Sequence, residues 1–286
     1  MYVKTIDYES PQAAQNFAES LKETGFAVLA NHPIPQDLVE GVYKDWQAFF
    51  NNESKFDYLF NPNTTRQAGY FPFKSENAKG YSTKDLKEFY HYRDETDLPK
   101  EVGKNIQFLF DKMKILAQEV LKWIEMGLPK EVARDLSIPL YQMIHESDMT
   151  LIRILHYPPI SANEEEGGIR AAAHEDIDLL TILPAATAAG LQILDSSGKW
   201  HEVSCNYGTL VFNSGDMLQM ATKGYYKSTT HRVINPVGDA ARRPRYSLPF
   251  FFHPRSEVGL SKTHTAGSYL EERLRELGLR PPPQAT

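Results

Sequence analysis

The sequence predicts an α+β protein with a mainly β core and helices at both ends of the chain. Long segments of the first half repeat apolar residues at helical spacing, whereas the chain from Thr150 onward consists of short apolar runs between turn residues. A further helical segment, 268–277, follows the last of these runs. The pattern changes near residue 148, so we expect two regions, 1–147 and 148–286, that form one integrated unit.

The first region begins with two predicted helices and a strand between them. In residues 10–24, Ser10 suits the N-cap and Pro11 the first helical position. Gly25 ends this helix, and the apolar residues 26–30 predict a buried strand. Residues 36–51 return to helical spacing.

The middle of the chain combines an aromatic segment with the clearest helix. Residues 55–98 are rich in aromatic side chains and have no clear period, and long segments of this kind are often functional. Residues 99–126 repeat apolar side chains at helical spacing up to Gly127, which predicts a long helix. A shorter helix is expected near residues 131–136.

The second region has the pattern of a β-sandwich or jelly roll. The expected strands are residues 151–157, 179–183, 191–194, 200–203, 209–212, 217–220, 231–234 and 246–252. Many short strands separated by turn residues are typical of these folds. We therefore expect a double-stranded β-helix (jelly roll) with flanking N-terminal and C-terminal helices.

Composition limits the classes of function. The chain has 286 residues, 41% hydrophobic and 24% charged, as in an ordinary globular protein. A net charge of −6 gives no electrostatic reason to expect nucleic acid or an anionic membrane. No apolar stretch approaches the roughly 20 residues of a membrane span. The single cysteine, Cys205, fits a reducing cytoplasm.

Two histidines and an aspartate carry the strongest chemical signal. His174 and Asp176 are two residues apart, and such residues in a strand point to the same face, whereas Glu175 would point away. His231 adds a second imidazole. Two histidines and one carboxylate on one face of a metal leave the opposite positions open, which is the ligand set of non-haem Fe(II) oxygenases. His156 is a weaker candidate because no carboxylate follows it at the same spacing.

Arg245 and Ser247 form a second pair with this spacing. The planar guanidinium of Arg245 suits a carboxylate, and Ser247 adds a hydroxyl. Arg242 and Arg243 precede Pro244 and are predicted to lie in a solvated loop.

The ordered set of His174-x-Asp176, His231 and Arg245-x-Ser247 resembles the iron(II)/2-oxoglutarate-dependent dioxygenases, and more narrowly their isopenicillin N synthase-like branch. The resemblance implies a jelly-roll core and Fe(II) held by the first three residues. It also implies that Arg245 and Ser247 bind the distal carboxylate of 2-oxoglutarate. The implied cofactors are Fe(II), 2-oxoglutarate as co-substrate and O2, with ascorbate in a supporting role.

The resemblance implies an oxidative reaction on a small organic metabolite, coupled to decarboxylation of 2-oxoglutarate to succinate and CO2. Tyr157 matches a family position whose hydroxyl contacts the 2-oxoglutarate carboxylate. Related halogenases have a small residue where this chain has Asp176, so hydroxylation, desaturation or ring closure is favoured over halogenation.

Two other functions remain open. An oxidase like isopenicillin N synthase or aminocyclopropane-carboxylate oxidase shares the iron ligands without using 2-oxoglutarate, and relatives reuse the Arg-x-Ser pair for a substrate carboxylate. A non-catalytic jelly-roll protein with a structural metal is the alternative from another class, and zinc is chemically possible in the same ligands.

The substrate side of the site is predicted from the same resemblance. In the family, the segment equivalent to residues 55–98 runs over the mouth of the barrel and contacts substrate. The residues that we single out as substrate contacts are Arg66, Tyr70, Tyr90, Tyr92, Arg153, Gln192 and Phe252. Because Arg66, Arg93 and Arg153 could take an acidic group, the expected substrate is a small carboxylate-bearing or amino-acid-derived metabolite. No nucleic-acid or membrane partner is expected.

Overall fold

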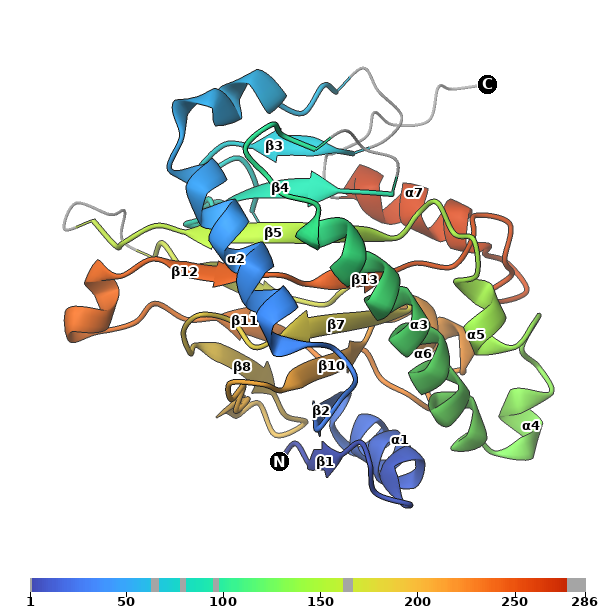
Figure 1. The fold of residues 1–286 in the computed structure, drawn as a ribbon. Coiled ribbons are helices and arrows are strands. Elements are labelled where there is room, and N and C mark those ends of the chain that lie inside the picture. Colours follow the sequence, from blue (N-terminus) through green and yellow to red (C-terminus); the bar gives the residue numbers. More distant parts are fainter. Residues whose placement is uncertain (1, 63–66, 78–80, 95–97, 162–166, 277–286) are drawn as a thin grey trace.

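The computed structural model describes residues 2–62, 67–77, 81–94, 98–161 and 167–276 (Figure 1). The α-helices are α1 (Ala13–Thr24), α2 (Gln36–Phe50), α3 (Asn105–Met126), α4 (Lys130–Ala133), α5 (Leu140–Met143), α6 (Asp216–Ala221) and α7 (Ala266–Glu276), with 3-10 helices at Glu53–Tyr58 and Gly238–Arg242. The strands are β1 (Thr5–Asp7), β2 (Phe26–Ala30), β3 (Gly69–Phe71), β4 (Glu88–Tyr92), β5 (Leu151–Tyr157), β6 (Ala171–His174), β7 (Leu180–Pro184), β8 (Leu191–Leu194), β9 (Trp200–Glu202), β10 (Leu210–Ser214), β11 (His231–Val233), β12 (Arg245–Ser247) and β13 (Phe250–Phe252).

Two sheets form the core of the molecule. The larger has nine strands in the order β1-β2-β10-β7-β13-β5-β4-β3, with β12 also paired to β5. The smaller has the order β6-β11-β8-β9. Apart from the parallel pair β1 and β2, these strand pairs are antiparallel. The predicted jelly roll is confirmed, and α2 and α3 lie across the outer face of the larger sheet (Figure 1).

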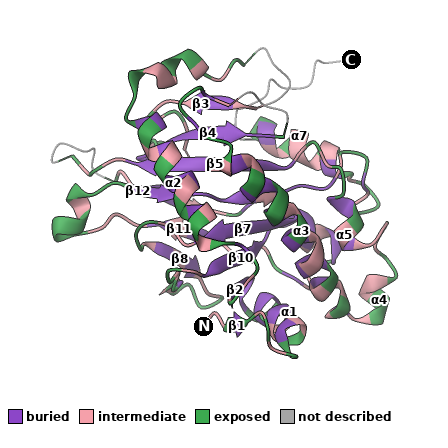
Figure 2. Ribbon diagram, in the orientation of Figure 1, coloured by how far each residue is buried: buried purple, intermediate pink, exposed green. Residues whose placement is uncertain are grey.

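The larger sheet is buried on both faces, which explains why its strands read as continuous apolar runs. Alternate residues of β2 show the division: Ala27 and Leu29 pack toward the helices, whereas Phe26 and Val28 pack with residues of the smaller sheet. Figure 2 shows this contrast between buried strands and helices that are exposed on one side. The space between the two sheets is where the functional site lies.

Gly25 joins the N-terminal helix to the wall of the site. It ends α1 with φ +74°, a left-handed conformation that glycine adopts readily, and its N–H donates to Leu21 O. A Cβ at this position would overlap Thr229 Oγ1 and lie 2.8 Å from Lys227 O. The close approach fixes the chain just before His231.

Some predicted elements differ from the structure. Residues 217–220 were expected to form a strand, but they lie within the helix α6, because a short apolar run fits either element. The helix α1 begins at Ala13, since Ser10 and Pro11 lie in a turn. Strands from both predicted regions share the larger sheet, and the division at residue 148 stays a prediction. Among the described residues, no helix has the length and apolarity to cross a membrane.

Candidate active site

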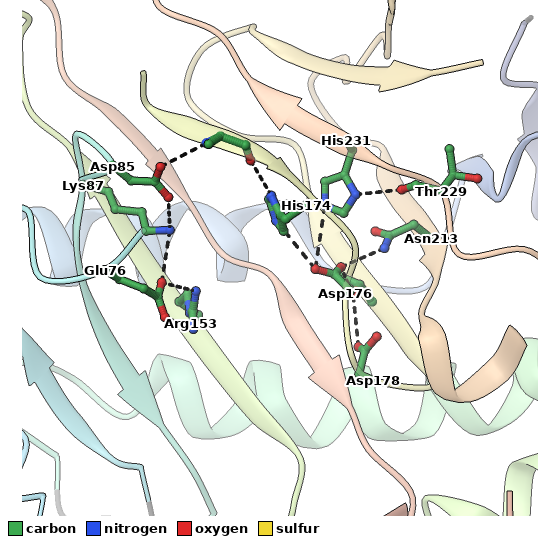
Figure 3. Close-up of polar contacts among 12 residues, drawn as sticks. Glu76, Asp85, Lys87, Arg153, His174, Asp176, Asp178, Asn213, Thr229 and His231 are labelled. Atoms are coloured by element: carbon green, nitrogen blue, oxygen red, sulfur yellow. Dashed lines mark hydrogen bonds and ion pairs between the residues drawn. The ribbon is translucent and has the colours of Figure 1, made fainter. Parts of the chain in front are cut away.

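Three potential metal ligands converge on one point between the sheets (Figure 3). His174 ends β6 and lies opposite His231 of β11 in the strand register. Asp176 follows two residues after the end of β6 and is buried. Its Oδ1 lies 3.8 Å from His174 Nε2 and 3.7 Å from His231 Nε2. Among the described residues, this is the group of His, Cys, Asp and Glu side chains that is arranged to hold a metal ion.

Hydrogen bonds to neighbouring groups orient each of these ligands. The Nδ1 atom of His174 lies 2.8 Å from Ala172 O, and that of His231 lies 3.1 Å from Thr229 O. A carbonyl can only accept, so each Nδ1 carries the proton and each Nε2 keeps a lone pair for the metal. Asp176 Oδ2 accepts from Thr181 Oγ1 at 2.6 Å and Asn213 Nδ2 at 2.8 Å. These contacts leave Oδ1 directed toward the two histidines (Figure 3).

The electrostatics favour the protonation states that bind metals. Burial and the neighbouring His231 lower the pKa of His174 to about 4, so His174 is neutral at pH 7. Burial alone would raise the pKa of Asp176, but the two imidazoles and the hydrogen bonds lower it. Neutral imidazoles and an ionised carboxylate are the forms that ligate a divalent cation. The donor set therefore fits Fe(II), with two histidines and one carboxylate on one side.

Arg245 and Ser247 lie on β12, opposite Tyr157 and Leu155 of β5 respectively. The Arg245 side chain is 2% exposed, and its Nε donates to Ala188 O at 2.9 Å. Its Nη1 is buried and has no hydrogen-bond partner. The guanidinium carbon lies 5.2 Å from the centre of the Tyr157 ring. A buried donor without a partner is costly, so this guanidinium fits an external anion such as a carboxylate.

A second arginine, Arg170, lies beside this group. It is 1% exposed, and its guanidinium carbon is 5.9 Å from the centre of the same Tyr157 ring. Its Nη2 donates to Arg243 O at 3.1 Å, and its Nε is buried without a partner. Burial and the nearby Arg245 lower the pKa of Arg170 to about 10. No carboxylate of the described residues forms an ion pair with Arg170 or Arg245, so this end of the site has an excess of positive charge.

A cavity that is partly open to solvent joins the candidate metal ligands to Arg245, Ser247 and Tyr157. Lys87 and Arg153 also line it. The apolar part of the lining consists of Phe26, Leu155, Ala171, Leu183, Leu191, Val233, Pro249 and Phe251. A mostly apolar cavity with a few convergent polar groups is typical of a small-molecule site.

The structure separates the predicted substrate contacts. Arg153 lines the cavity, whereas Tyr70, Tyr90 and Tyr92 lie in the core on the helix side of the larger sheet. Successive side chains of a strand point to opposite faces of the sheet. In β4, Phe89 therefore faces the smaller sheet, whereas Tyr90 and Tyr92 are buried in the core on the helix side. These three tyrosines therefore do not line the cavity.

Gln192 and Phe252 also point away from the cavity. Gln192 accepts two hydrogen bonds from Arg232, while its neighbours Leu191 and Ile193 are buried between the sheets. Phe252 packs on the helix side, and the preceding residue, Phe251, lines the cavity instead. Arg66 lies outside the described residues.

Several residues of the site carried little or no signal in the sequence. Thr181 is an isolated polar residue within an apolar run, and that isolation was the signal that could have identified it, whereas Asn213 begins the polar turn-like segment 213–216 and has no such signal. Lys87 has no pattern around it that distinguishes it from a surface lysine. His156, the competing histidine, bonds Glu88 Oε1 at 2.6 Å and stacks on Tyr246, and it is not part of the ligand group.

The chain is similar to known proteins over most of its length. The family model described as the 2OG-Fe(II) oxygenase superfamily matches residues 148–254, and that of the non-haem dioxygenase in morphine synthesis N-terminal matches residues 3–109. A 2-oxoglutarate-Fe(II) type oxidoreductase from Aspergillus fumigatus is 28% identical over 264 residues, which cover 84% of this chain and 76% of the relative.

Solved structures extend the similarity to the whole fold. A candidate oxygenase from Shewanella oneidensis is 49% identical, covers 98% of this chain and 100% of its own, and has a TM-score of 0.88. A Neurospora crassa protein in complex with alpha-KG shares the fold at 24% identity, with 96% and 95% of the two chains covered and a TM-score of 0.77. Together with the family matches, these similarities show that the chain belongs to the 2OG-Fe(II) oxygenase superfamily and is a 2-oxoglutarate-dependent dioxygenase.

Proposed function

We propose that His174, Asp176 and His231 hold Fe(II), and that Arg245 and Ser247, with help from Tyr157, hold the distal carboxylate of 2-oxoglutarate. The single observation that carries this assignment is one cavity with three convergent ligand atoms and the unpartnered Nη1 of a buried arginine. The enzyme then oxidises a small organic molecule, most simply by hydroxylation, and acts in the cytoplasm with ascorbate as a supporting reductant. We also place it in the isopenicillin N synthase-like branch.

When bound, Fe(II) supplies the oxidation by O2 that couples conversion of 2-oxoglutarate to succinate and CO2 with oxidation of the substrate. The protein residues supply position and charge. The carbonyls of Ala172 and Thr229 keep both Nε2 atoms unprotonated and directed inward. Thr181 and Asn213 hold the Asp176 carboxylate so that one oxygen faces the histidines. These contacts orient the ligand atoms toward one another.

Arg245 acts as a fixed anchor in this assignment. Its Nε donates to Ala188 O, and this hydrogen bond fixes the orientation of the guanidinium. Ser247, two residues along the same strand, presents its hydroxyl on the same face. Leu155 and Tyr157 line the cavity beside them and exclude water from the ion pair that forms.

The proposed function is tested by measuring succinate formed from 2-oxoglutarate with Fe(II), ascorbate and O2. We expect slow turnover without substrate and faster turnover with a component of a metabolite pool. Anaerobic addition of 2-oxoglutarate to the Fe(II) protein should also give a weak visible charge-transfer band. One bound iron per chain without succinate or the band would favour an oxidase that does not use 2-oxoglutarate, with Arg245 as a substrate anchor.

The metal assignment has its own matched pair of variants. Asp176→Ala removes the carboxylate between the two histidines and should abolish both stoichiometric iron binding and succinate formation. Glu175→Ala is the control, because Glu175 is exposed and bonds Thr230 Oγ1 on the outside. Full activity of the Asp176 variant would remove this residue from the ligand set.

A further inference from the structure

The wall of the cavity beside His174 carries a compact group of charges that the proposed function does not use (Figure 3). Lys87 Nζ lies 2.8 Å from Asp85 Oδ2 and 3.1 Å from Glu76 Oε2. Arg153 Nη1 lies 3.0 Å from the same Glu76 oxygen, and its Nε donates to His91 Nε2 at 2.8 Å. Lys87 and Arg153 line the cavity directly.

This group is electrically balanced. Two cations face two carboxylates, and His91 is neutral because burial and the nearby Arg153 hold its pKa well below the ordinary value. Burial alone would lower the pKa of Lys87, but Glu76 and Asp85 raise it. An additional carboxylate here would leave one negative charge without a partner in a largely buried site, which is unfavourable.

The group nevertheless retains hydrogen-bond donors. An ammonium has three N–H groups and a guanidinium has five. Contacts with Asp85 and Glu76 use two of those on Lys87, and contacts with Glu76 and His91 use three of those on Arg153. One N–H of Lys87 and two of Arg153 are left without a partner among the described residues. A neutral acceptor can bond to these donors without adding charge.

The position of the group places it at the substrate end of the cavity. Tyr157, Leu155 and Arg153 are alternate residues of β5 that all line the cavity, and Arg245 lies opposite Tyr157. Arg153 is therefore about 13 Å along the strand from the co-substrate anchor. Asp85 Oδ1 accepts from the N–H of Ala172, whose carbonyl accepts from His174, so the charge group is tied to the candidate metal ligand through one residue.

We propose that Lys87 and Arg153 bind a neutral carbonyl group of the substrate, as in an amide, a lactam or an imide, rather than a carboxylate. The proposal rests on the proposed function, which assigns the opposite end of the cavity to 2-oxoglutarate. It replaces the acidic substrate expected from the sequence. Arg153 is already paired with Glu76, and Arg93 donates to the carbonyls of Asp148 and Met149.

The test is equilibrium binding by calorimetry to the full chain loaded anaerobically with Fe(II) and 2-oxoglutarate. The probes are pairs of an amide and an acid with the same hydrocarbon skeleton, such as benzamide with benzoate and phenylacetamide with phenylacetate. We expect each amide to bind at least tenfold more tightly than its acid. Tighter binding of the acids, or the absence of any amide that binds, would overturn the proposal.

Glu76→Gln gives the sharper result because it removes one negative charge and keeps nearly the same shape. The group would then have an excess of positive charge, and the preference should change by tenfold or more toward the acids. Glu88→Gln is the matched control, since Glu88 is also paired with a lysine, but its partner Lys55 does not line the cavity, whereas the Glu76 partners Lys87 and Arg153 do. An unchanged preference in the Glu76 variant would contradict the proposal.

The two proposals fail in different measurements. Succinate formation and 2-oxoglutarate binding without any probe test the assignment of Arg245 and the metal ligands. The ranking of amide against acid tests only the Lys87 and Arg153 group. If the Glu76 variant does not fold, which thermal unfolding would show, the ranking in the wild-type protein still decides.

Discussion

The two ends of the cavity differ in whether their cationic side chains have carboxylate partners. At one end, Arg245 and Arg170 lie near the same tyrosine ring with no carboxylate partner among the described residues. At the other end, Lys87 and Arg153 are each paired with a carboxylate. A buried cation without a partner is costly unless an anion arrives, whereas a balanced group gains little from another charge. This contrast is the basis on which we propose that the anion binds at the Arg245 end.

Arg245→Met should have the largest effect of the variants that test this difference between the two ends. The variant removes the unpaired guanidinium at the co-substrate end, and hydrogen bonds to charged groups are each worth about 1.5–3 kcal/mol. We expect the KM for 2-oxoglutarate to rise by about 100-fold or more. Steady-state succinate formation measures this effect.

Arg232→Met is the control for Arg245. Arg232 also lies over an aromatic ring, 4.0 Å from the centre of Trp200, and donates to a nearby acceptor, Gln192, but does not line the cavity. Its KM for 2-oxoglutarate should stay near that of the wild type. An equal rise in the KM of the two variants would contradict the assignment of Arg245 as the anchor of 2-oxoglutarate.

Gly25→Ala changes the backbone packing near His231 and leaves every charge of the cavity in place. A methyl group here would overlap Thr229 in a backbone with φ +74°, just before His231. We expect a loss of roughly 2–4 kcal/mol of unfolding free energy, together with weaker iron binding, because Thr229 O holds His231 Nδ1. Denaturant unfolding and iron titration measure these effects.

Gly198→Ala is the matched control for Gly25, since Gly198 has φ +83° with no atom within 4 Å of the added carbon. It should lose only about 1 kcal/mol, the cost of the left-handed backbone alone. Similar losses in both variants would show that contact with the Thr229 segment contributes nothing.

Arg170→Met tests whether the excess of charge, and not Arg245 alone, attracts the co-substrate. Removal of the second guanidinium should raise the KM for 2-oxoglutarate about tenfold. Replacing an unpaired buried cation by an apolar side chain is often neutral or stabilising, so thermal stability should be equal or higher. Lower stability with an unchanged KM would instead assign Arg170 a structural role through Arg243 O.

The sequence was informative where function depends on residues two positions apart, along one strand for Arg245 and Ser247 and across the end of β6 for His174 and Asp176. The pairs His174 with Asp176 and Arg245 with Ser247 needed only the two-residue repeat, and the structure brings both pairs into one cavity. The substrate wall depends on register, and a shift of one residue was enough to name Phe252 in place of Phe251. Hydrogen-bond and ion-pair partners that come from distant segments of the chain left no pattern in the local sequence.

Asn213 illustrates that limit: it bonds Asp176 across 37 positions of the sequence, through strands that meet only in the folded sheet. Lys87 is a second example, because it shares Glu76 with Arg153, which belongs to the distant strand β5. The balance of charge around Lys87 and Arg153 was therefore visible only in three dimensions, and it is the basis on which we propose a neutral substrate group in place of the acidic group expected from the sequence.

The smallest effect is expected for the pH dependence of the preference for amides over acids. If the charges around Lys87 and Arg153 stay balanced, this preference should hardly change with pH. Burial alone would raise the pKa of Glu76, but Arg153 and Lys87 lower it, so Glu76 is ionised, and its stabilisation is lost only as pH falls below its ordinary pKa of 4.5. His91 is neutral because its pKa lies well below 6.5. Glu76, His91 and Lys87, whose pKa is raised, therefore keep their protonation states between about pH 6 and 8, where benzoate is also ionised. The ratio of benzamide to benzoate affinity should therefore change by less than about twofold across this range. A tenfold change, measured by calorimetry at both ends of the range, would mean that one member of the group titrates and that the balance is not the basis of the preference.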